Sequence, residues 1–397
     1  MELTSDWCGA TFGPRLRAIL SDLHQHPELS MEEHRTTARI REVLAETAVE
    51  IVDVGAETGV VARLAGGEGP AVGLRADIDA ITQQERADRP DRSLTDGKMH
   101  GCGHDIHTTG LLGAAMALSR CRDQLRGDVY FIFQPAEESL SGARYLVDRC
   151  GLWDKLHLDA IFGLHNYPEL PVGTVGIRPG PLMSYKDGFS LRLVGRSGHS
   201  SMPQKNIDPI VAAAALIQSL QTIASRNVGP LDAAVISVCQ LHAGNAAGLV
   251  VDDAALSGNI RTLDPDVRAR VLQRFRQIAE GTAAAYECGL ELDLHPIVPG
   301  VCNDGALLPA AQAAAVAALG EGSVRTPPVN LASEDFSIYG LTVPSFFYFL
   351  GSGAPERPLY SWHNACFHPD ERTPIYGAAL LAQSVLAAQR QLSGDTP

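Results

Sequence analysis

The segment DVYFIFQPAEES, residues 128–139, is a short apolar run that ends at two adjacent carboxylates. Two similar apolar runs are AVGLRAD, 71–77, and LDAIFGLH, 158–165. A helix-like segment, 107–125, lies between the run at 71–77 and the one that begins at 128. Continuous apolar strands that alternate with helices are typical of an α/β domain whose sheet is largely buried. The sequence therefore predicts an α/β fold for this part of the chain.

A different pattern begins near residue 184. The segment GFSLRLVG, 188–195, alternates apolar and polar residues with a period of two, as a half-exposed strand does. Further segments follow in the order helix, strand, strand, helix, strand: 209–225, 233–241, 254–263, 265–287 and 289–296. This β-α-β-β-α-β order is that of the split-βαβ, or ferredoxin-like, arrangement. We therefore expect an inserted α+β domain, 184–297, within a larger α/β domain that comprises 1–183 and 298–397.

The composition is that of an ordinary globular enzyme. The 397 residues are 45% hydrophobic and 20% charged, and the net charge of −14 argues against a nucleic-acid or anionic-membrane partner. The N-terminal segment lacks a basic start followed by an apolar run, and no apolar stretch approaches the roughly 18 residues that span a membrane. The eight cysteines are scattered without paired spacing, which indicates free thiols and a cytoplasmic protein.

Polar side chains with metal-ligand chemistry follow several of the apolar strands. The carboxyl ends of strands in an open α/β sheet form its ligand-binding edge, so we expect these side chains to lie close together. The segment GKMHGCGHDIH, 97–107, adds a thiol and imidazoles in a loop before a helix. Imidazole, carboxylate and thiol ligands suit zinc or manganese. The candidates are Asp77, Asp79, Cys102, His104, Glu137, Glu138, His165 and His363.

Two of these features are ambiguous by themselves. In the pair Glu137–Glu138, one carboxylate could bind a metal ion while the other accepts a proton from water, but two acidic residues in a turn are more often simply solvated. Cys102 could be a metal ligand, an inert buried thiol, or a nucleophile with His104 or His107 as its base.

The chain resembles the metal-dependent aminoacylase and hippurate hydrolase family in seven motifs. They are GKMHGCGHDIHTTGLLGAA, FQPAEES, GLHNYPELPVGTVGIRPG, GRSGHSSMPQKNIDPI, GNIRT, SEDF and WHNACFHPDE, in the order seen in that family. The family includes N-acyl-amino-acid amidohydrolases and the plant hydrolases of auxin–amino-acid conjugates. The resemblance extends from about residue 15 to 390. It implies a zinc-peptidase-like catalytic domain with a mixed central sheet and an inserted lid domain that often forms dimers.

The resemblance also implies roles for individual residues. Five residues match the ligands of the family's two-metal site: Cys102, His104, Glu138, His165 and His363. Glu137 matches its general acid/base. Asp79 lies where related metallopeptidases have an aspartate that orients a metal-ligating histidine, although the nearby Asp77 makes this match less specific.

Two residues of the inserted domain match substrate-binding positions. His199 matches a histidine that reaches the scissile carbonyl, often from a partner subunit. Arg261 matches a basic residue placed for the substrate carboxylate, and the planar guanidinium suits bidentate pairing with a carboxylate. The chain departs from the family at Gly248, where asparagine is usual, and at Val251, where proline is usual. These departures concern the substrate end of the site and leave the metal ligands intact.

We therefore expect an amidohydrolase that cleaves an N-acyl amino acid into a carboxylate and a free amino acid. Its cofactors would be two divalent metal ions, Zn²⁺ or Mn²⁺, or else Co²⁺ or Ni²⁺. The alternatives are a dipeptidase or N-carbamoyl-amino-acid hydrolase on the same scaffold, a cysteine hydrolase that uses Cys102, and a non-catalytic binding protein. The expected assembly is a homo-oligomer, with a dimer favoured, and no nucleic acid or membrane is expected as a partner.

Several other polar residues have structural interpretations. His24 and His26 lie at the end of a helix-like segment, where we expect them to be structural. His100 and His107 flank the candidate ligands and are expected to support them. The charge-rich segment QQERADRPDRSLTDG, 83–97, is expected to be solvated.

Overall fold

The computed structural model describes residues 3–394, which divide into two compact units. Unit 1 contains the residues up to Gly180, the segment Cys302–Pro328 and the residues from Asp335 onward. Unit 2 contains Pro181–Val301 and the short segment Val329–Glu334. Within residues 3–394, every helix is too short or too polar to cross a membrane.

Unit 1 is built on one eight-stranded sheet. In spatial order its strands are β1 (Glu50–Val52), β2 (Val60–Leu64), β4 (Gly127–Gln134), β3 (Gly69–Asp77), β5 (Ala160–Pro171), β16 (Ser345–Gly353), β6 (Val175–Gly176) and β15 (Val324–Arg325). The four central strands β4, β3, β5 and β16 are parallel neighbours, whereas β1–β2, β2–β4 and β16–β6 are antiparallel pairs. The predicted α/β class with a mixed central sheet is confirmed.

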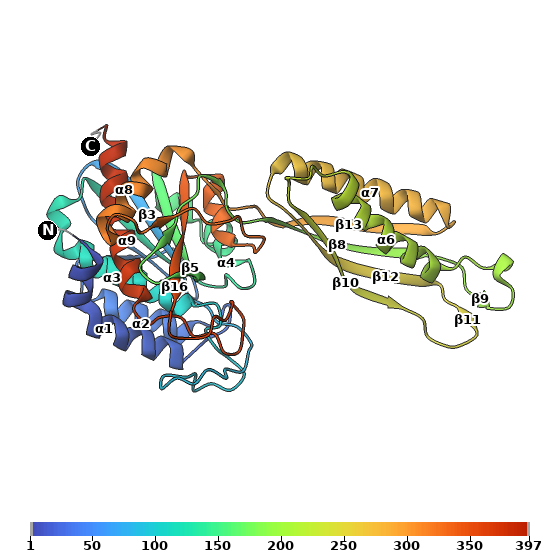
Figure 1. Ribbon diagram of the computed structural model, residues 1–397, viewed down its shortest axis with the longest axis horizontal. Helices are drawn as coiled ribbons and strands as arrows, with labels where there is room; N and C mark the ends of the chain where they lie inside the picture. The colour runs from blue at the N-terminus through green and yellow to red at the C-terminus, as the bar shows by residue number, and fades with distance from the viewer. Residues whose placement is uncertain (1–2, 395–397) are drawn as a thin grey trace. The chain divides into compact units, whose positions relative to one another are not determined.

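Five longer helices pack in unit 1, and Figure 1 shows α3, α8 and α9 gathered beside the sheet. They are α1 (Ser5–Gln25), α2 (His34–Leu44), α3 (His104–Arg120), α8 (Leu308–Leu319) and α9 (Thr373–Leu392). The shorter helical segments are η1 (Arg122–Gln124), α4 (Gly142–Arg144), η2 (Tyr145–Arg149), α5 (Leu152–Lys155), η4 (Gly305–Leu307) and η5 (Asp335–Leu341). α3 is apolar on nearly all sides and buried along its length, as expected of a helix enclosed by α1, α9 and the sheet.

The strand alternation of unit 1 separates an apolar core from a polar layer. Leu74, Phe162 and Phe346 belong to the same buried cluster as residues of α3 and α9. Successive side chains of a strand point to opposite faces, so Arg75 of β3 faces away from this cluster. Arg75 is fully buried and donates to Asp77 and Asp335 at 3.0 and 2.9 Å. The polar layer therefore lies on the sheet face that carries Asp77, at the carboxyl end of β3.

Unit 2 is a four-stranded antiparallel sheet in the order β10-β12-β8-β13, and Figure 1 shows α6 and α7 along it. Its main elements are β8 (Tyr185–Val194), α6 (Pro209–Arg226), β10 (Ala234–Ala243), β12 (Asp253–Thr262), α7 (Pro265–Ala285) and β13 (Gly289–Val298). The smaller ones are β9 (Gly198–His199), η3 (Pro203–Lys205) and β11 (Leu249–Val250). β7 (Gly180–Pro181) and β14 (Cys302–Asn303) lie where the chain passes between the units. The expected ferredoxin-like order is confirmed.

Sequence signals mark both long helices of unit 2. Asp208 and Asp264 are their N-caps, and each carboxylate accepts hydrogen bonds from backbone N–H groups of the first turn. A proline follows each cap, at a position where the missing N–H costs nothing. One side of the sheet and the two helices enclose a core that includes Phe189, Leu216 and Phe275.

Candidate metal centre

Strand ends and loops of unit 1 bring six of the predicted residues into one cluster. Three overlapping groups of ligand atoms each lie within 4.8 Å of one another: Cys102 with His104 and His165, Cys102 with Glu138 and His363, and His104 with Glu137 and Glu138. Within these three groups Cys102, His104 and Glu138 each occur twice, and His104 belongs to a further group with Asp77 and His107. The six residues therefore form a continuous set of donors, with the thiol shared between two of the groups.

The hydrogen bonds of His104 determine which of its ring nitrogens faces the cluster. Its Nδ1 lies 3.0 Å from Asp79 Oδ1, and because the carboxylate accepts, Nδ1 carries the proton. Its Nε2 is buried and makes no hydrogen bond within residues 3–394. The other oxygen of Asp79 accepts from the Ser30 hydroxyl and the Glu138 backbone N–H, at 2.7 and 3.0 Å. Asp79 thus orients His104 and positions the Glu138 backbone.

His165 and His363 also place their Nε2 atoms beside other members of the cluster. His165 Nδ1 donates to the backbone oxygen of Asn166 at 2.8 Å, which leaves Nε2 without a proton, 3.4 Å from Cys102 Sγ. His363 Nε2 lies 3.3 Å from Glu138 Oε1. That oxygen is buried and, among the described residues, makes no hydrogen bond. A lone pair on a buried nitrogen or oxygen with no hydrogen bond is available to a cation.

The backbone at the cluster adopts conformations that L-residues rarely adopt. Ala136, before the two glutamates, has φ +56°, and His363 has φ +60°. Gly103, between two of the candidate ligands, has φ +88°, and a Cβ there would lie 2.4 Å from Asn166 Nδ2. Such positions cost about 1–3 kcal/mol each for a non-glycine residue and concentrate at functional sites. The loops are therefore held in shape by their surroundings.

The carboxylates of the cluster outnumber its positively charged groups, and they shift the pKa values of the side chains beside them. Burial disfavours charge on His104, but the neighbouring Asp77, Asp79 and Glu138 outweigh it and raise its pKa to about 10. Burial, together with Glu138 and Glu137, raises the pKa of the Cys102 thiol well above its usual value. Both shifts show that the surrounding carboxylates favour additional positive charge. The donor set of thiol, imidazole and carboxylate, with its unsatisfied buried atoms, fits divalent metal ions.

Comparisons with known proteins give the family. The model of the peptidase family M20/M25/M40 matches residues 73–387. The N-acetylcysteine deacetylase of Bacillus subtilis (strain 168) is 43% identical over 374 residues, which cover 94% of this chain and 96% of that protein. The chain belongs to peptidase family M20/M25/M40. The IAA-amino acid hydrolase ILR1-like 4 of Arabidopsis thaliana is 36% identical over 94% of this chain and 86% of its own.

A solved structure agrees with this M20 assignment. The crystal structure of the Bacillus subtilis YXEP protein, described as a dinuclear metal binding peptidase from the M20 family, matches with a TM-score of 0.86 and 38% identity. The match covers 96% of this chain and 99% of that one. The resemblance inferred from the motifs is thereby confirmed, and so is the prediction of a metal-dependent hydrolase of amide bonds.

Asp77, Asn166 and Trp362 also contact residues of the donor cluster; sequence analysis named Asp77 as a candidate ligand but assigned no role to Asn166 or Trp362. Asp77 Oδ1 accepts from His107 Nδ1 at 2.6 Å, and Asp77 Oδ2 lies 3.5 Å from His104 Nε2. Trp362 Nε1 donates to the Asn166 backbone oxygen at 3.1 Å. Strand alternation was a usable signal for Asp77, because it lies two residues before Asp79. Asn166 and Trp362 stand directly beside His165 and His363, but adjacency alone does not indicate a contact.

His199 and Arg261 lie in unit 2, where each has contacts within that unit. The Ser201 backbone N–H donates to His199 Nδ1 at 3.1 Å, so in the neutral ring the proton is on Nε2. His199 is exposed. Arg261 Nη1 donates to Leu331 O at 2.6 Å and to Ser333 Oγ at 3.0 Å.

A second buried network of this M20 chain corrects the expectation that 83–97 is solvated for part of that segment. Within that segment, Glu85 is only 2% exposed. His24 Nε2 lies 3.2 Å from Glu85 Oε1, and its Nδ1 lies 2.7 Å from Asp105 Oδ2. Arg89 makes two hydrogen bonds to Asp91, and its side chain is 4% exposed. A paired charge can be buried, so Glu85 and Arg89 pack against the ends of α1 and α3. Arg86, Asp88 and Arg92 of the same segment are exposed, as expected.

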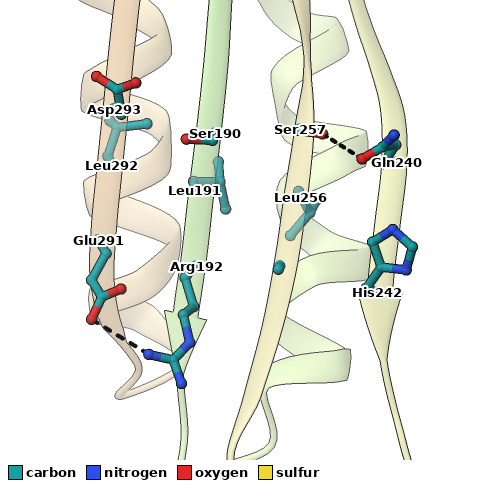
Figure 2. Close-up of a pocket in the computed structure, with 11 residues that line it drawn as sticks. Ser190, Leu191, Arg192, Gln240, His242, Leu256, Ser257, Glu291, Leu292 and Asp293 are labelled. Carbon is teal, nitrogen blue, oxygen red and sulfur yellow. Dashed lines mark hydrogen bonds and ion pairs between the residues drawn. The ribbon is translucent and has the colours of Figure 1, made fainter.

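A hollow lined by residues of unit 2 alone lies on the open face of that unit's sheet. It has a volume of about 500 Å³. Figure 2 shows that its polar side chains come from adjacent strands, with Arg192 directed at Glu291 and Ser257 at Gln240. This is the polar alternation of a half-exposed sheet, already paired across strands. The hollow holds none of the predicted catalytic residues.

Proposed function

We propose that the chain is an M20 amidohydrolase that cleaves the amide bond of an N-acyl amino acid, using two divalent metal ions. The observation that carries the proposal is the buried donor cluster, in which His104 Nε2 and Glu138 Oε1 make no hydrogen bond within the described residues. Two kinds of relative support the substrate class. One is named an N-acetylcysteine deacetylase and the other an IAA-amino acid hydrolase.

In this proposal five residues hold the metal ions: Cys102, His104, Glu138, His165 and His363. The overlap of the donor groups supports a two-metal site, because one group of three donors includes His165 and another includes His363, with Cys102 in both. Zn²⁺ or Mn²⁺ suits this mixture of thiolate, imidazole and carboxylate, and Co²⁺ or Ni²⁺ could replace them. The likeness to the YXEP protein, a dinuclear metal binding peptidase, supports the stoichiometry.

Divalent metal ions at such a site supply positive charge that lowers the pKa of water and polarises an amide carbonyl. In this proposal Glu137 transfers the proton. It is 6% exposed, and its Oε2 lies 3.9 Å from His104 Nε2. Its carboxylate accepts a proton from the attacking water and returns it to the leaving nitrogen. Glu138, next in sequence, binds metal and is not available for this transfer. The two carboxylates take different roles in this proposal because Glu138 Oε1 also lies 3.3 Å from His363 Nε2 and belongs to a second donor group, with Cys102.

Unit 2 supplies two substrate contacts in this proposal. His199 carries a proton on Nε2 in its neutral form, so it can donate to the oxygen that becomes negative in the tetrahedral intermediate. Arg261 uses Nη1 for contacts within unit 2, which leaves the Nε and Nη2 donors for bidentate binding of the substrate carboxylate. Unit 2 is proposed to act as a lid, and as the dimerisation domain of a homo-oligomer. A cytoplasmic location suits the eight cysteines, which are free thiols.

The decisive test is Glu137→Gln in metal-reconstituted protein. The proposal requires turnover to fall by at least about 100-fold, the scale of general-base catalysis, with metal content unchanged. Loss of metal together with activity would instead make Glu137 a ligand. Activity should also disappear on dialysis against a chelator and return with Zn²⁺ or Mn²⁺. Activity that survives chelation would favour the cysteine hydrolase. Sequence analysis named His104 or His107 as the base of Cys102, and His165 is a further candidate because its Nε2 lies 3.4 Å from Cys102 Sγ.

The substrate class is tested with a panel on the same preparation. It comprises N-acetyl, N-benzoyl, long-acyl and indole-acetyl amino acids, with dipeptides and N-carbamoyl amino acids for the alternative activities. Peptides belong in the panel because thermostable carboxypeptidase 1 of Saccharolobus solfataricus is 33% identical over 94% of this chain. Failure to hydrolyse any amide would contradict the proposal. Light scattering checks the dimer.

A further inference from the structure

Asn166 makes hydrogen bonds to several parts of the proposed metal centre. Its side-chain Nδ2 donates to the Cys102 backbone oxygen at 2.6 Å and lies 3.0 Å from His107 Nε2. Its backbone oxygen accepts from His165 Nδ1 at 2.8 Å and from Trp362 Nε1 at 3.1 Å. Asn166 is fully buried, so these contacts have no competition from solvent.

Asn166 is itself held in place by a chain of buried hydrogen bonds. His107 Nε2 accepts from the Asn166 backbone N–H at 2.8 Å, while His107 Nδ1 donates to Asp77 at 2.6 Å. Asp77 in turn accepts from Arg75 at 3.0 Å. The Asn166 side-chain oxygen accepts from Ser352 Oγ at 3.2 Å. The amide therefore cannot rotate without breaking contacts to both α3 and β16.

The same bonds explain why His107 differs from His104. Both ring nitrogens of His107 are engaged, Nδ1 with Asp77 and Nε2 with Asn166, so His107 has no lone pair left for a cation. His104 occupies the same face of α3 one turn earlier and keeps Nε2 without a hydrogen bond among the described residues. The backbone N–H and the side-chain Nδ2 of Asn166 thus both lie against His107 Nε2, so His107 is not available as a metal ligand.

We propose that the Asn166 side chain is a positioning group that fixes the peptide of Cys102 and thereby the direction of its thiolate towards the metal ions. The proposal rests on the metal centre assigned under the proposed function. Without the Nδ2 donor, the Cys102 carbonyl oxygen loses its partner and the loop at Gly103, which has φ +88° against Asn166, is released. A thiolate shared by two donor groups would then lose its alignment with both.

Asn303 provides a matched control within unit 1. It is 2% exposed and also makes buried amide hydrogen bonds, donating to Arg178 O at 2.8 Å and to Phe347 O at 2.9 Å. It accepts from the Phe347 N–H at 2.7 Å. Asn303 lies outside the donor cluster, so its replacement costs comparable buried hydrogen bonds without touching the ligands.

The experiment compares Asn166→Ala and Asn166→Leu with the same two substitutions at Asn303, in the full-length chain. Metal affinity is measured by chelator competition with Zn²⁺, and thiolate ligation by the near-ultraviolet charge-transfer band of the Co²⁺-substituted protein. Both Asn166 variants should lose about 10–100-fold in the affinity of at least one metal ion, as expected when a group that orients ligands is removed. They should also lose intensity in the cobalt–thiolate band. The Asn303 variants should keep both readouts.

The outcomes separate this proposal from the one on which it rests. The proposal for Asn166 would be overturned if both Asn166 variants kept the metal affinity and the cobalt–thiolate band. It would also be overturned if Asn166→Ala were defective and Asn166→Leu were not, because side-chain volume alone would then explain the defect. If neither Asn166 variant folds, Ser352→Ala decides, because it removes only the bond to Asn166 Oδ1 and should lower metal affinity in the same direction. Wild-type protein that binds no metal would refute the metal centre itself.

Discussion

Gly103→Ala should destabilise unit 1 far more than alanine at an otherwise similar glycine. Gly103 lies between Cys102 and His104, with φ +88°, and a Cβ there would be 2.4 Å from Asn166 Nδ2 and 3.1 Å from Asn166 Cγ. Asn166 is fully buried and held by several hydrogen bonds, so it cannot move away cheaply. The substitution therefore adds backbone strain and a steric conflict at one position.

The two contributions have different sizes and can be separated. An L-residue in the left-handed region costs about 1–2 kcal/mol. Forcing an extra carbon into a well-packed interior costs about a further 1–3 kcal/mol. Gly103→Ala should therefore lower the free energy of unfolding by about 2–5 kcal/mol. Gly97 has φ +74° and, within the described residues, no heavy atom within 4 Å of an added Cβ, so Gly97→Ala should cost only the first contribution.

Urea denaturation of the metal-free proteins, followed by tryptophan fluorescence, measures the difference. All three tryptophans, Trp7, Trp153 and Trp362, lie in unit 1, so the signal reports that unit. An unchanged slope with a midpoint lowered by about 1 M in Gly103→Ala would indicate loss of stability without a change in the surface exposed. Metal-free conditions exclude any contribution from ligand binding. Equal stabilities of the two variants, within about 0.5 kcal/mol, would refute the steric argument.

Two further predictions concern the buried charge network and the substrate contact. Burial opposes charge on His24, but Asp105 and Glu85 outweigh it and raise its pKa above the ordinary 6.5. The stabilisation is therefore fully present below about pH 6.5 and is lost as pH rises through the folded-state pKa, so the destabilisation by His24→Gln should shrink as the pH is raised above about 6.5 in urea titrations. A difference independent of pH would contradict this. Arg261→Lys should lower kcat/KM for an N-acyl amino acid by about 10–100-fold, because the bidentate donors are lost. The same loss on the carboxamide analogue of that substrate would show that Arg261 does not bind the carboxylate.

Much of the architecture could be predicted because it depends on local periodicity. The change from continuous apolar strands to alternating ones near residue 184 marks the change from a sheet buried on both faces to one with an open face. Asp208 and Asp264, each followed by proline, mark helix starts that the structure places at the expected residues. The start of α3 was predicted three residues late, because Gly103 gives no capping signal.

Burial of charge was harder to predict from the sequence. The segment 83–97 has the composition of a solvated loop, yet Glu85 and Arg89 are enclosed. The partner of Glu85 is His24 of α1, which is distant in sequence, and Asp105 of α3 joins the network through His24. Composition measures how polar a segment is, whereas burial depends on whether another segment offers a complementary charge.

The candidate donors were determined by the sequence alone, since thiol, imidazole and carboxylate groups recur at strand ends and in the loop before α3. Tertiary structure decided which of these groups are free to bind a metal ion. His104 and His107 stand one turn apart on the same helix and are equivalent in spacing. Asp77 and Asn166, from β3 and β5, occupy both nitrogens of His107, whereas Asp79 occupies only Nδ1 of His104. A ring nitrogen can bind a metal ion only if no other group occupies its lone pair, and those groups come from strands that only folding brings together.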